Sequence, residues 1–150
     1  MKPYYYLTAL LFLWLSACST PLEPATATTF TEVCSEQNAD KRVSLEGYFR
    51  LPSMFMVSDT ALLDFYELPD GDGIDIDVSV EIGTGANQME DIPDDFTDDD
   101  LKVRTNENEL IGSNDKVIVA GTVYRYADST NEGRFLCFLT SPVTIERAEE

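Results

Sequence analysis

Residues 43–49, Val-Ser-Leu-Glu-Gly-Tyr-Phe, and residues 117–123, Val-Ile-Val-Ala-Gly-Thr-Val, share one pattern: apolar residues at alternate positions and a glycine at the fifth. An apolar residue at every second position predicts a β-strand with one buried face. Glycine inside a strand weakens it unless the chain coils sharply or another backbone passes close by, as at the corner of a small barrel. Gly47 and Gly121 therefore predict two related strands of a strongly coiled sheet.

Alternation recurs elsewhere in the chain. It is clearest over residues 74–82, where Ile or Val alternates with Asp, Ser or Glu. Residues 60–68, together with 54–57, predict another strand, with Leu63 and Phe65 facing the core. Further strands are expected over residues 43–51, 101–105, 117–126 and 135–145. Pro142 should lie at an edge or an irregularity of the last strand, because proline cannot donate to a β-ladder.

Residues 91–101 lack this alternation. Pro93 suits the first turn of a helix, and Thr97 with Asp100 fits a capping box, so one or two helical turns are expected there. No stretch of the sequence suits a long amphipathic helix.

These features resemble bacterial OB-fold domains. In those domains the first strand carries such a glycine, the fourth begins with a Gly-Asp-Lys-Val type lead, and a short helix separates strands three and four. The corresponding lead here, residues 113–117, is Ser-Asn-Asp-Lys-Val and departs at the glycine. The resemblance spans about residues 41–146 and implies a mainly β fold. We expect a small five-stranded OB-like barrel with a short helix between strands 3 and 4, in which the first and fourth strands are neighbours. A small β-sandwich is the alternative.

The N-terminus has the features of an export signal. Lys2 precedes an apolar run over residues 7–15, which is too short to span a bilayer. Residues 15–18, Leu-Ser-Ala-Cys, resemble the lipobox of bacterial lipoproteins. The resemblance implies a signal peptide over residues 1–17, a lipid on Cys18 and attachment to a membrane through that lipid. Ser19 after the cysteine favours the outer membrane, facing the periplasm, within the bacterial cell envelope. An ordinary secretory signal is the alternative.

The rest of the chain divides into a tether and a domain. Residues 18–29 contain the lipidated cysteine and a small, polar, proline-containing tether, and residues 30–150 form the β-barrel domain. The remaining cysteines, Cys34 and Cys137, are an even pair in an exported protein and predict a disulfide. The alternatives are two buried free thiols, or a reducing cytoplasm if the N-terminus is not an export signal.

Composition excludes several functions. The chain carries 28 acidic and 10 basic residues, a net charge of -18, which argues against a nucleic acid partner because phosphate binding requires clustered Lys and Arg. It contains no histidine, so Ser-His-Asp triads, Cys-His nucleophiles and His-based zinc sites are excluded. Catalysis would have to rest on carboxylates or on an unusual nucleophile.

Residues 70–100 contain 12 acidic residues and no Lys or Arg, a density of oxygen ligands that suggests calcium. An EF-hand loop starting at Asp70 fails, because Ile74 occupies a ligand position and Asp75 replaces the turn glycine. A solvated acidic surface is the alternative. We expect no cofactor other than weakly bound Ca²⁺, for which the candidate ligands are Asp70, Asp72, Asp94, Asp95 and Asp98.

Tyrosines are the candidate partner-binding residues. The alternation places Tyr48, Tyr66, Tyr124 and Tyr126 away from the core, and three of them could share one ligand-sized area if their strands are adjacent. Tyrosine suits interfaces because it combines a rigid apolar ring with a polar tip. Cross-strand packing that only stiffens the sheet is the alternative.

Three functions are compatible with these features. The first is a lipid-anchored, non-catalytic envelope lipoprotein that acts as a binding or structural module, with an envelope protein or glycan as its partner. The second is a calcium-responsive envelope protein. The third is a carboxylate-dependent glycan hydrolase.

Overall fold

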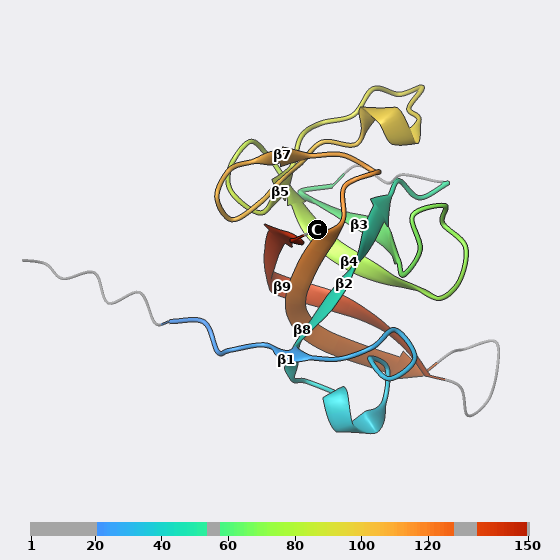
Figure 1. Cartoon of the computed structure of the whole chain (residues 1–150), viewed down its shortest axis with the longest axis vertical. Coiled ribbons are helices and arrows are strands. Elements are labelled where there is room, and N and C mark those ends of the chain that lie inside the picture. Colours follow the sequence, from blue (N-terminus) through green and yellow to red (C-terminus); the bar gives the residue numbers. More distant parts are fainter. Residues whose placement is uncertain (1–20, 54–57, 128–134, 150) are drawn as a thin grey trace, which may run out of the picture.

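A closed barrel forms the centre of the molecule. The computed structural model describes residues 21–53, 58–127 and 135–149. The barrel strands are β2 (Arg42–Arg50), β3 (Thr60–Tyr66), β4 (Asp75–Ile82), β8 (Val117–Ala127) and β9 (Phe135–Arg147). They pair in the closed order β2-β3-β4-β9-β8-β2, parallel between β4 and β9 and antiparallel elsewhere (Figure 1). The predicted mainly β, five-stranded OB-like barrel is confirmed.

The alternation in sequence places the core inside this barrel. Along β2 the side chains of Val43, Leu45 and Phe49 are buried, and along β3 those of Leu63 and Phe65 are buried as predicted. The alternate residues of each strand reach the outer wall, because successive side chains of a strand point to opposite faces of the sheet.

The two glycines lie at the two ends of one ladder. In the β2–β8 register Gly47 is opposite Val117 and Gly121 is opposite Val43. A Cβ atom at Gly47 would lie 2.3 Å from the carbonyl oxygen of Tyr66, and one at Gly121 would lie 3.1 Å from Cβ of Leu139. Another part of the chain passes close to both glycines, as the sequence predicted: Gly47 leaves no room for a side chain, and a Cβ at Gly121 would be tightly packed.

The helix expected between the third and fourth barrel strands is not formed. The segment contains β5 (Gln88–Met89), β6 (Val103–Arg104), β7 (Leu110–Ile111) and a single 3₁₀ turn, η2 (Asp98–Asp100). The Asp100 carboxylate accepts hydrogen bonds from the Thr97 N–H (2.8 Å) and hydroxyl (3.2 Å), so the predicted capping pair exists on this turn alone. Ile92 and Phe96 pack against the core from irregular backbone, and the five Asp between residues 94 and 100 favour turns over a helix interior.

Short strands close one end of the barrel instead. Met89, Leu101, Val103 and Ile111 are almost fully buried and belong to the same apolar core as the barrel strands. Figure 1 shows β5, β7 and η2 at the upper end and the 3₁₀ turn η1 (Glu36–Asn38) at the opposite end. In the part of the chain that the structure describes, no helix is long and apolar enough to cross a membrane.

The N-terminal segment joins the barrel earlier than its composition indicated. β1 (Thr26–Ala27) pairs in parallel with β2, with Thr26 opposite Val43, and the Thr28 N–H donates to the Ser44 carbonyl (3.0 Å). The last residues of the expected tether are therefore part of the sheet. The expected signal, residues 1–17, and Cys18 lie outside the described residues, as do residues 54–57 of one predicted strand.

Two features of β9 agree with prediction. Cys34 and Cys137 form a disulfide, with Cα atoms 5.4 Å apart, between the loop before β2 and the last barrel strand. The β8–β9 register shifts between the pairs Ala120–Thr144 and Thr122–Thr140, so Pro142 lies at the irregularity.

Candidate binding face

The four candidate tyrosines form two pairs. Tyr48 on β2 is the cross-strand partner of Tyr66 on β3, and both side chains are half-buried. Tyr124 and Tyr126 lie on β8, 51 % and 39 % exposed. The β2–β8 ladder runs only to Thr122, so the two β8 tyrosines are not ladder neighbours of Tyr48, and an area shared by three tyrosines stays a prediction.

Phe138 of β9 completes an aromatic cluster with the β8 tyrosines. Its ring centroid lies 5.1 Å from that of Tyr124 and 6.2 Å from that of Tyr126, and the two tyrosine rings are 6.3 Å apart. These separations are typical of favourable aromatic pairs. Sequence reasoning missed Phe138, although Leu139 at the next position is a core residue and alternation would have placed Phe138 on the outer wall.

Carboxylates lie beside this cluster. Phe138 is the register partner of Asp77 on β4, and Asp77 is the cross-strand partner of Asp64 on β3. Asp75, two residues before Asp77, is opposite Tyr66. Because neighbouring strands lie about 5 Å apart, these side chains share one continuous surface. We call it the aromatic–acidic face, made of Tyr124, Tyr126, Phe138, Asp64, Asp75 and Asp77.

The carboxylates of the aromatic–acidic face disfavour one another's charge. Burial raises the pKa of Asp77, and the neighbouring charge of Asp75 raises it further. Burial also raises the pKa of Asp64, with smaller contributions from Asp77, Asp75 and Asp98. The pKa of Tyr66 is raised by burial and then by the same carboxylates, Asp64 first. Positive charge brought to this surface would be stabilised.

Arg50 is in register with the carboxylates of the aromatic–acidic face, and its hydrogen bonds go elsewhere. Arg50 on β2 is the cross-strand partner of Asp64, but its guanidinium donates to the carbonyls of Ser113 (2.7 Å) and Pro69. It also lies 3.7 Å from the Asp98 carboxylate. Arg50 therefore links the β3–β4 turn, the β5–β6 loop and the lead into β8.

The candidate calcium ligands lie in two separate loops. Asp70 accepts a hydrogen bond from the Asp72 N–H (3.2 Å) in the β3–β4 turn, and Asp98 accepts one from the Leu51 N–H (3.0 Å). Asp94 and Asp95 lie with Asp98 along an open hollow in the β5–β6 loop. Among the described residues, no three acidic or cysteine side chains converge in an arrangement that could hold a metal ion. Calcium binding stays a prediction.

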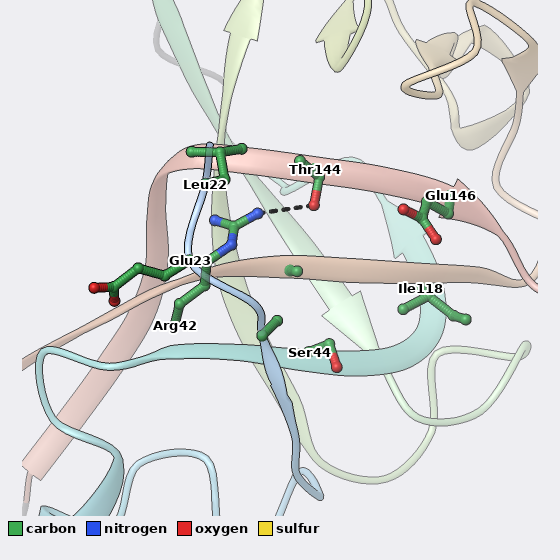
Figure 2. Close-up of a pocket in the computed structure, with 9 residues that line it drawn as sticks. Leu22, Glu23, Arg42, Ser44, Ile118, Thr144 and Glu146 are labelled. Carbon is green, nitrogen blue, oxygen red and sulfur yellow. Dashed lines mark hydrogen bonds between the residues drawn. The ribbon is translucent and has the colours of Figure 1, made fainter. Parts of the chain in front are cut away.

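A hollow of about 300 Å³ lies between the N-terminal segment and the outer side of β2, β8 and β9. Figure 2 shows Leu22, Arg42 and Thr144 at one end, Ile118 and Glu146 at the other, and Glu23 pointing away. Arg42 donates to the Thr144 hydroxyl (2.9 Å) and to the Pro142 carbonyl, so its guanidinium holds β2 to β9. The hollow therefore lies where these strands meet, and Arg42 in its lining holds two of them together.

The chain matches no protein-family model, and no curated protein matches it.

Proposed function

We propose that the protein is a lipid-anchored, non-catalytic binding module of the bacterial cell envelope, and that the aromatic–acidic face holds its partner. The observation that carries this proposal is the cluster of the exposed Tyr124 and Tyr126 with the half-buried Phe138, beside carboxylates on the outer wall of a closed barrel. Exposed aromatic rings gathered in one place are typical of protein interaction surfaces.

The chemistry of the face favours binding over catalysis. Asp64 and Asp77 are a carboxylate pair with raised pKa values, which a glycan hydrolase could use. They lie, however, on the outer wall of a barrel, which is convex, whereas hydrolysis requires a cleft that encloses the scissile bond. The chain offers no histidine to assist them.

The anchoring part of the proposal rests on the lipobox resemblance of residues 15–18. If Cys18 carries the lipid, residues 19–25 are the only chain between the anchor and β1. Seven extended residues span at most about 25 Å, so the barrel would stay close to the membrane surface. The Cys34–Cys137 disulfide suits the oxidising periplasm that we propose for it.

Crosslinking in intact cells tests the binding function. Tagged full-length protein is crosslinked in the bacterium that makes it, and the crosslinked partners of the wild type are compared with those of Tyr124→Ser/Tyr126→Ser. The matched control is Leu22→Ser/Leu110→Ser, which removes two exposed apolar side chains (51 % and 45 % exposed) outside the face. We expect loss of partners in the tyrosine variant only. An unchanged set of partners would overturn the proposed function.

A further inference from the structure

On the basis of the proposed function, we infer that the aromatic–acidic face binds a cationic polypeptide segment. The Lys or Arg side chains of this bound segment would lie between the ring cluster of β8 and β9 and the carboxylates of β3 and β4. The docking surface is the outer wall of the barrel, and its negatively charged carboxylates select a positively charged segment.

The charge distribution supports a cationic partner. β3 and β4 together contain Asp64, Asp75, Asp77 and Glu81, and neither strand contains a lysine or arginine. Asp64 and Asp77 are direct cross-strand partners, and like charges placed opposite each other on a sheet destabilise it. Arg50, next in register to Asp64, is committed to the carbonyls of Ser113 and Pro69. An incoming ammonium or guanidinium group would relieve this repulsion.

The aromatic cluster supports the same chemistry. Lysine and arginine side chains bind over the faces of tyrosine and phenylalanine rings through cation–π attraction, in addition to apolar contact with their methylene stems. Phe138 neighbours Asp77 across the β4–β9 ladder, so one bound side chain can contact both a ring and a carboxylate. Nucleic acid and phosphate would be repelled from the same place by the protein's charge of -18.

The spacing of the carboxylates fits an extended peptide. Asp75 and Asp77 are alternate residues of β4, so their positions recur about every 7 Å along the strand. A peptide in β conformation with Lys at alternate positions presents its amines at the same spacing. A neutral glycan could stack on the rings but would leave the carboxylate repulsion in place, which is why we favour the peptide.

Two-dimensional NMR titration of the ¹⁵N-labelled protein tests the inference. The probe is a ten-residue peptide of alternating Lys and Gly, with the matching Glu–Gly peptide and a neutral peptidoglycan oligosaccharide as comparisons. The protein variants are Asp75→Asn/Asp77→Asn, Tyr124→Ser/Tyr126→Ser and the control Asp91→Asn/Asp99→Asn. The control removes the same two charges from exposed positions outside the face.

We expect the Lys–Gly peptide to shift resonances of β4, β8 and β9, and its affinity to fall at least tenfold in both face variants but less than twofold in the control. Equal weakening in the control would overturn the inference, since net charge alone would then explain binding. Binding of the oligosaccharide in place of the peptide, or no shift with either probe, would also overturn it. The proposed function would still stand in those cases if the tyrosine variant loses its crosslinked partners in cells.

Discussion

At the scale of single residues, the surroundings of each carboxylate decide whether its charge stabilises the fold. Burial and the charge of Asp75 raise the pKa of Asp77 above its ordinary value. Burial alone would also raise the pKa of Asp115, but hydrogen bonds from the Gly112 N–H (2.8 Å) and the Arg147 guanidinium (2.6 Å) outweigh it and lower that pKa. The two carboxylates should therefore affect stability in opposite directions.

Replacing each of these two aspartates with asparagine should change the stability of the fold in opposite directions. Because the pKa of Asp77 is raised, its ionisation costs stability as pH rises from the ordinary value of 3.8 through the folded pKa. The lowered pKa of Asp115 instead contributes stability that is present above 3.8 and lost as pH falls through the folded pKa. At pH 7 we expect Asp77→Asn to raise the melting temperature and Asp115→Asn to lower it.

Thermal unfolding of the wild type and both variants at pH 7 and pH 4 provides the measurement. The Asp77→Asn difference should shrink at pH 4, because its raised pKa favours the protonated carboxyl there, whereas the Asp115→Asn difference should persist, because its lowered pKa keeps that carboxylate ionised in the folded protein. A lower melting temperature for Asp77→Asn at pH 7 would contradict the proposed repulsion.

At the scale of elements, alternation was enough to predict the barrel strands but not what closes the barrel. β4 buries Ile76, Val78 and Val80 as its pattern indicates. The strand expected over residues 101–105 contains β6, but β5 and β7 have two residues each, too few to show a period, and they are held by tertiary burial of Met89 and Ile111. The helix was expected between β5 and β6, from turn and capping residues and from the domains that the chain resembles.

In the candidate site, too, alternation predicted one property and failed to predict another. Alternation correctly placed the four tyrosines on the outer wall. It could not show that Tyr124 lies beside Phe138 and Tyr48 beside Tyr66, because those neighbours depend on the register of strands far apart in sequence.

Substitution of Gly47 tests how closely β2 and β3 approach each other in the barrel. Gly47→Ala would place a methyl group 2.3 Å from the Tyr66 carbonyl oxygen, so β2 or β3 must shift, and we expect a loss of roughly 1 to 3 kcal/mol. Gly112→Ala is the control, because its Cβ would make ordinary contacts from 3.6 Å. Urea unfolding measures both, and equal stability of the two variants would contradict the close approach at Gly47.

At the scale of the whole molecule, the disulfide joins the start of the barrel domain to its last strand. Cys34 and Cys137 are 103 residues apart, so the bond constrains most of the unfolded chain. By the chain-entropy relation, Cys34→Ser/Cys137→Ser should lower the free energy of unfolding by about 4 to 5 kcal/mol. Urea unfolding of the variant against the oxidised wild type measures the loss. A difference below about 1 kcal/mol would contradict this role of the disulfide.

The anchor is a second property of the whole molecule. In the producing bacterium, the wild type should incorporate an alkyne analogue of palmitate and sediment with membranes. Cys18→Ser should incorporate none, because the acylated thiol is gone, and should accumulate uncleaved or soluble. In-gel fluorescence after click labelling measures incorporation of the analogue in both proteins. An unlabelled wild type would rule out the lipoprotein interpretation.

Contact between the aromatic–acidic face and a partner can be detected in cells by placing a photo-crosslinking residue on that face. Benzoylphenylalanine is introduced at position 124, and separately at the exposed position Glu107, in the otherwise unchanged full-length protein in living cells. We predict a discrete crosslinked adduct from position 124 that is absent from position 107 and is lost when Asp75→Asn/Asp77→Asn is added. No adduct at position 124, or the same adduct from both positions, would contradict binding of a partner at this face.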